Sequence, residues 1–100
     1  MWTISHGTAA IHPSYTTVAR LADQLAHVLP AADWGVLRPL IDRLSGDPFT
    51  IPASEAGRIA AVLDRAASHP LMPRDWRELT CDLAAAARRA STAGDAWAWS

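Results

Sequence analysis

Large apolar residues alternate with small or polar ones at both ends of the chain. Near the start, Trp2 and Ile4 are separated by a threonine, and near the end Trp97 and Trp99 are separated by an alanine. A period of two predicts extended segments with each pair of large side chains on one face. A third short segment, residues 49–51, needs strand partners because such short strands are not stable alone. We therefore predict a small antiparallel sheet built from residues 2–6, 49–51 and 97–99.

Between these segments, apolar residues recur at helical spacing in four stretches. The predicted helices cover residues 14–29, 33–44, 52–68 and 74–93. Asp33 is a suitable N-cap for the second helix, and Gly94 a suitable end for the fourth. Pro39 should kink or break the second helix, because proline lacks an N–H and clashes with the preceding turn. The predicted fold class is mainly α (α+β), with about four helices and a sheet formed by the two termini and a short middle strand.

Length and composition favour one small globular domain over residues 1–100. Half of the 100 residues are hydrophobic, which suffices for a single core. The net charge of −1 gives no electrostatic support for nucleic acid or a membrane surface as a partner. No apolar run reaches the roughly 18–20 residues that span a bilayer, and the start does not resemble a signal peptide. Cys81 has no partner for an internal disulfide, so we expect a reducing, cytoplasmic location.

The sequence offers little for catalysis or metal binding. No two histidines lie four residues apart on a predicted helix, and no pair of cysteines exists. His6 and His12 flank a predicted turn and could converge, but a local hydrogen bond is the commoner role for such a histidine. Ser5 and His6 are neighbours in a strand and should point to opposite faces, so they are poor evidence for a catalytic pair. We predict no catalytic residue, no metal site and no cofactor.

A helix-turn-helix arrangement would use residues 33–44 as its second helix. Arg38 and Arg43 are balanced there by Asp33 and Asp42, and most of the segment is apolar. A recognition helix needs an exposed polar and basic face toward phosphates and bases. DNA binding is therefore disfavoured.

Apolar residues that are expected at the surface are the remaining indication of function. Leu71 and Met72 lie between prolines in a loop and are expected to be exposed, whereas Trp97 and Trp99 fit either the core or a contact surface. The leading prediction is a non-enzymatic protein-interaction module that uses these four residues and can self-associate through an edge of the terminal sheet. The protein partner is unidentified. The alternatives are a small DNA-binding transcriptional regulator and a small-ligand binder or enzyme built around His6 and Trp99.

Four segments carry a resemblance to a known group of proteins: residues 2–7 (WTISHG), 46–52 (GDPFTIP), 72–76 (MPRDW) and 97–99 (WAW). Together they resemble small proteins of unassigned function encoded by actinobacteria and their phages. The resemblance covers nearly the whole chain. It implies a cytoplasmic bacterial or phage setting, in which binding to another protein is a common role, and it assigns no functional residue.

Overall fold

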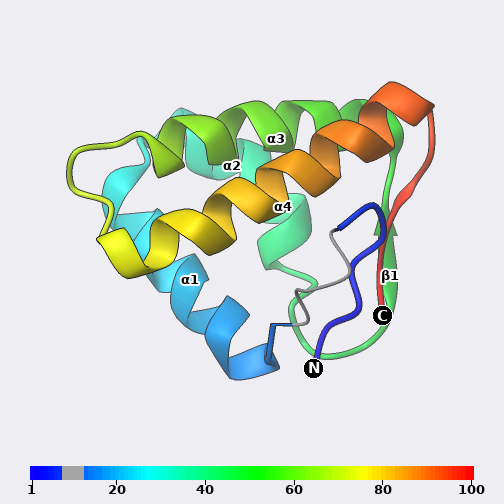
Figure 1. Ribbon diagram of the computed structural model, residues 1–100, viewed down its shortest axis with the longest axis horizontal. Coiled ribbons are helices and arrows are strands. Elements are labelled where there is room, and N and C mark those ends of the chain that lie inside the picture. The colour runs from blue at the N-terminus through cyan, green and yellow to red at the C-terminus, as the bar shows by residue number, and fades with distance from the viewer. Residues whose placement is uncertain (8–12) are drawn as a thin grey trace.

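The computed structural model describes residues 1–7 and 13–100, and in these ranges it contains four helices and two short strands (Figure 1). In chain order the elements are α1 (Tyr15–Val28), α2 (Ala31–Ile41), β1 (Phe49–Ile51), α3 (Ala53–Ala67), α4 (Arg74–Ala93) and β2 (Trp97–Trp99). This is the mainly helical fold with a small antiparallel sheet that the apolar pattern predicts.

Helices α3 and α4 lie side by side along the length of the molecule (Figure 1). Their facing sides are rich in buried alanines, which lets two helix axes approach closely. A Cβ placed on Gly57 of α3 would lie only 2.7 Å from Oγ of Ser91 on α4. The loop between them is short, and α4 ends at Gly94, whose φ of 72° is the left-handed conformation that glycine adopts without strain.

The sheet joins segments from the two ends and the middle of the chain. β1 pairs with β2 in antiparallel register, with Phe49 opposite Trp99 and Ile51 opposite Trp97. The N-terminal segment lies along the other edge of β2, where the Thr3 N–H donates to the Ser100 carbonyl at 2.7 Å and the Ser100 N–H donates back at 2.9 Å. An isolated bridge joins Ile4 to Trp99. The three segments therefore meet, with β2 in the centre, but only β1 and β2 form strands, and the predicted N-terminal strand is reduced to a single bridge.

The outer edges of this sheet have little free backbone to offer another strand. The Ala98 N–H donates to Ser5 Oγ, so the backbone of Ala98 faces the N-terminal segment and Thr50, opposite it in β1, faces outward. Arg43 donates to the outward Thr50 carbonyl at 2.9 Å. On the other edge the Trp2 N–H donates to the Pro13 carbonyl at 2.8 Å. Each outer edge of the sheet is thus contacted by another part of the chain.

Helix α2 differs from the sequence-based expectation at its start, and it is not broken at Pro39. It begins at Ala31 after Pro30, and Asp33 lies in its first turn rather than at its N-cap. The helix also runs unbroken through Pro39 to Ile41. Leu37 and Leu40 on either side of the proline are buried, and their packing offsets the lost hydrogen bond.

The core lies between the helices and the inner face of the sheet. Trp34 and Trp76 are half-buried and pack against it, in agreement with their positions on apolar stripes. Within the described ranges, none of the helices combines the length and the apolar character required to cross a bilayer.

Candidate functional site

Trp97 and Trp99 belong to the core. Their exposed fractions are 0% and 1%, and they form an aromatic cluster with Trp2 and Phe49. Trp99 stacks on Phe49 at 5.5 Å between ring centroids and meets the Trp2 ring edge-on at 5.4 Å. A partner protein could reach neither β2 tryptophan without opening the terminal sheet.

The loop between α3 and α4 separates the other two predicted contact residues. Met72 is 2% exposed and belongs to the core, which corrects the expectation that it lies on the surface. Leu71 is 74% exposed. The loop turns back on itself, because the Met72 N–H donates to the His69 carbonyl at 3.0 Å and the Leu71 N–H donates to His69 Nδ1 at 3.0 Å. A buried methionine therefore anchors a loop that holds a leucine out in water.

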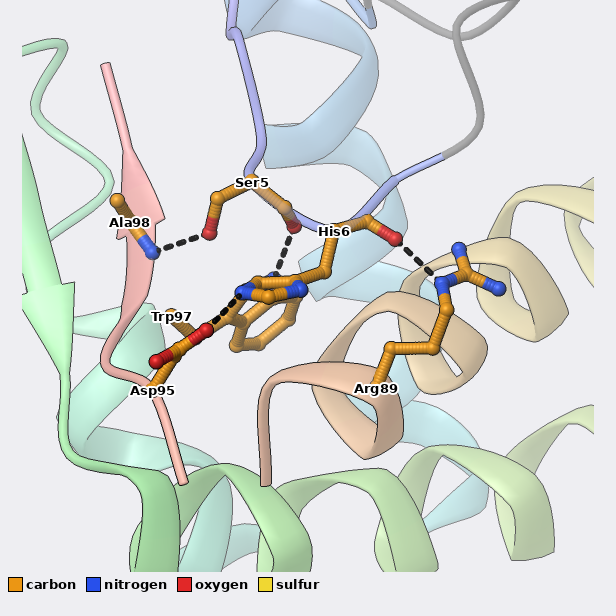
Figure 2. A network of polar contacts seen from close by, with 6 residues as sticks. All are labelled: Ser5, His6, Arg89, Asp95, Trp97 and Ala98. Carbon is orange, nitrogen blue, oxygen red and sulfur yellow. Dashed lines mark hydrogen bonds and ion pairs between the residues drawn. The ribbon is translucent and has the colours of Figure 1, made fainter. Parts of the chain in front are cut away.

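A polar network joins the N-terminal turn to the end of α4 and to β2 (Figure 2). The His6 imidazole lies beside the Asp95 carboxylate, with 3.4 Å between Nε2 and Oδ2. Arg89 Nε donates to the His6 carbonyl at 2.6 Å, and Trp97 Nε1 donates to the Ser5 carbonyl at 3.1 Å. His6 has a φ of 60°, a conformation that is uncommon outside glycine and is held here by these contacts.

The network has some of the residue types of a hydrolytic site without the required arrangement. Ser5 Oγ accepts a hydrogen bond from the Ala98 N–H at 2.7 Å and points toward β2, whereas the His6 ring turns to Asp95 (Figure 2). Among the described residues, no hydrogen bond joins the Ser5 hydroxyl to the imidazole. These contacts join the N-terminal segment to the end of α4 and to β2.

Metal binding through His6 and His12 cannot be placed, because His12 lies outside the described residues. Over residues 1–7 and 13–100, no three histidine, cysteine or acidic side chains come together in a way that could hold a metal ion. Trp99, which a ligand site near His6 would use, has a buried indole Nε1 with no hydrogen-bond partner in the same ranges.

Five of the nine arginines contact other groups within the chain. Arg65 on α3 makes two contacts to the Asp33 carboxylate on α2, at 2.9 and 3.3 Å, and Arg88 on α4 pairs with Asp64 on α3. Arg38, Arg43 and Arg89 also have partners within the chain. These five arginines are spread over α2, α3, α4 and the segment that follows α2.

A shallow groove between α2 and α3 was not expected from the sequence. It has a volume of about 280 Å³ and is lined by Ala32, Gly35, Val36 and Pro39 from α2 and by Glu55 and Arg58 from α3. The α2 residues follow a spacing of three, four and seven, so a stripe of small and apolar side chains was visible in the sequence. Only the pairing of the two helices shows that this stripe faces a groove.

Comparison with curated proteins and with solved structures gave no match. A family model does match, over residues 4–100, and its description is a domain of unknown function (DUF7739). The match covers the terminal network, all four described helices and both strands, and on this basis the chain belongs to the DUF7739 family.

Proposed function

We propose that this chain is a non-enzymatic protein-interaction module that recognises its protein partner through Leu71. The observation that carries the proposal is the contrast between the two neighbouring loop residues, since Met72 is buried and Leu71 is 74% exposed. An ordered loop that presents a large apolar side chain to water is suited to insert it into a pocket of another protein.

The two alternative functions have less support from the same geometry. A DNA-binding regulator would need free cations along one exposed face, but five of the nine arginines contact groups within the fold. An enzyme built around His6 and Trp99 would need an accessible Trp99 and a free nucleophile beside the imidazole. Trp99 is buried, and the Ser5 hydroxyl oxygen accepts from the Ala98 N–H and makes no hydrogen bond to the imidazole among the described residues.

The setting of the module is part of the proposal. A free and exposed thiol, that of Cys81, is compatible with a reducing compartment such as the cytoplasm. We also propose an actinobacterial or phage source, which rests on the resemblance of the terminal and loop segments given above.

Affinity capture from the lysate of the native host tests this function, with recovered proteins measured by mass spectrometry in the presence and absence of nuclease. We expect one protein to be recovered stoichiometrically under both conditions by the wild type and to be lost with Leu71→Asp. The control is Ala26→Asp, which adds the same charge at an exposed position of α1. Capture that requires nucleic acid would favour the regulator, and capture that Leu71→Asp leaves intact would overturn the role of Leu71.

A further inference from the structure

The groove between α2 and α3 carries an inference independent of Leu71. The α2 side contributes only small or apolar residues, and a Cβ placed on Gly35 would have no heavy atom within 4 Å. The backbone of α2 is therefore open to close approach by another helix, because small residues at a contact reduce the distance between helix axes. The Asp33–Arg65 ion pair links the two helices near the N-terminal end of α2.

Two opposite charges line the α3 side of this groove. Glu55 and Arg58 are three residues apart, which places them on one side of the helix. Neither side chain has an ion-pair partner within residues 1–7 and 13–100. A surface with one acid and one base next to each other is complementary to itself under a two-fold rotation, because each acid then faces the base of the other copy.

We propose that a second copy of this chain binds the α2–α3 groove about a two-fold axis. The small and apolar faces of the two α2 helices pack against each other, and Glu55 of each copy pairs with Arg58 of the partner subunit. A contact of this kind is small, and interfaces below about 1,200 Å² are usually transient. We therefore expect a Kd on the order of tens of micromolar.

Charge exchange gives the sharpest test, with sedimentation velocity over about a hundredfold range of concentration around the expected Kd. Glu55→Arg and Arg58→Glu should each weaken the dimer about tenfold, because each turns two attractive contacts into two repulsive ones. The double variant E55R/R58E should dimerise like the wild type. An equimolar mixture of the two single variants should form a heterodimer, since one then carries two acids and the other two bases at the groove. Arg77→Glu, at an exposed position of α4, is the control and should leave the dimer unchanged.

Gly35→Gln provides a second test that does not depend on charge. The new side chain has room in the monomer and raises helix propensity, so the thermal midpoint should stay the same or rise. The same side chain should fill the groove and abolish the dimer. Far-UV circular dichroism checks that each variant keeps its helices.

A wild type that stays monomeric over the whole range would overturn the proposal. It would equally be overturned by a dimer that both Gly35→Gln and the single charge variants leave intact, or by a mixture of the single variants that does not associate. Loss of partner capture by Leu71→Asp has no bearing on these measurements, so failure of the proposed function and failure of this inference can be distinguished.

Discussion

Replacing Trp97 with alanine tests whether the terminal sheet is part of the core or a surface addition. The side chain is fully buried and touches Trp99 edge-on, with 5.2 Å between ring centroids. Truncating a buried tryptophan to alanine typically costs about 3–5 kcal/mol through lost burial and the cavity left behind. The change also removes the Nε1 donor of the Ser5 carbonyl, which adds about 1 kcal/mol. We therefore expect Trp97→Ala to lower the free energy of unfolding by about 4–6 kcal/mol.

This loss is large compared with the total stability of a small domain, which is about 5–15 kcal/mol. Urea denaturation at 25 °C, followed by far-UV circular dichroism, should show either a much lower midpoint or a chain already unfolded without urea. Trp97→Phe keeps much of the apolar contact and loses the hydrogen bond, so it should cost about 1–3 kcal/mol. The pair of variants separates the packing of the indole from its N–H contact to Ser5.

An unfolding free energy for Trp97→Ala within about 1 kcal/mol of the wild type would refute the argument, because surface substitutions usually have effects of that size or less. The expected result also affects how a binding assay is interpreted. If Trp97→Ala abolishes partner capture, its circular dichroism spectrum must first show a folded chain before Trp97 is given any role in binding.

Three further predictions concern the stability of the helices. Gly57→Ala would place a Cβ 2.7 Å from Ser91 Oγ, a contact that rotation of the serine hydroxyl relieves, so the gain in helix propensity should offset the cost and leave the thermal midpoint close to that of the wild type. The double variant with Ser91→Ala needs no such rotation and should raise the midpoint; a large loss for both variants would contradict this argument. Gly94→Ala should cost about 1–2 kcal/mol in urea denaturation because its φ of 72° is strained for any residue with a Cβ, and a neutral effect would mean that α4 ends differently. Burial raises the pKa of the Asp82 carboxyl, and the nearby charge of Glu78 adds to the shift. The folded state therefore binds this proton more tightly than the unfolded state does. The free energy of unfolding should fall as the pH rises from the pKa of the unfolded state through that of the folded state. Asp82→Asn should therefore raise the thermal midpoint at pH 7, and this gain should vanish below about pH 3.9, the ordinary pKa of aspartate. An equal gain at pH 7 and below pH 3.9 would show that the raised pKa of Asp82 is not its cause.

Local sequence signals predicted the parts of the fold that depend on local physics. α4 has the predicted bounds, Arg74–Ala93, because Pro73 precedes a charged first turn and Gly94 supplies the left-handed residue that ends it. The first predicted helix starts at residue 14, and Ser14 is the N-cap of α1, where its hydroxyl accepts from the Thr17 N–H at 3.0 Å. The alternation of large side chains at the two termini was sufficient to predict extended segments that meet, although the two segments lie almost a chain length apart in the sequence.

The features that were missed depend on tertiary contacts. The position of Met72 between two prolines predicts a loop, but the loop folds back and inserts one of its two apolar residues into the core. Pro39 would break an isolated helix, yet α2 is supported by buried leucines on both sides. The α2–α3 groove could be predicted only by knowing that these two helices are neighbours, and neither the charges nor the spacing of residues in the sequence shows this.

The pairing of Thr3 with Ser100 has a consequence for how the chain folds. These residues are 97 positions apart, and bringing them together costs the loop-closure entropy of almost the entire chain. Helices α3 and α4 are joined by a short loop and can dock early, whereas Trp97 and Trp99 follow every helix in order of synthesis. On the ribosome, the aromatic cluster therefore cannot assemble until all the helices have been made. Until then, the place of β2 along the N-terminal segment stays empty, and Trp2 lacks its edge-on contact with Trp99.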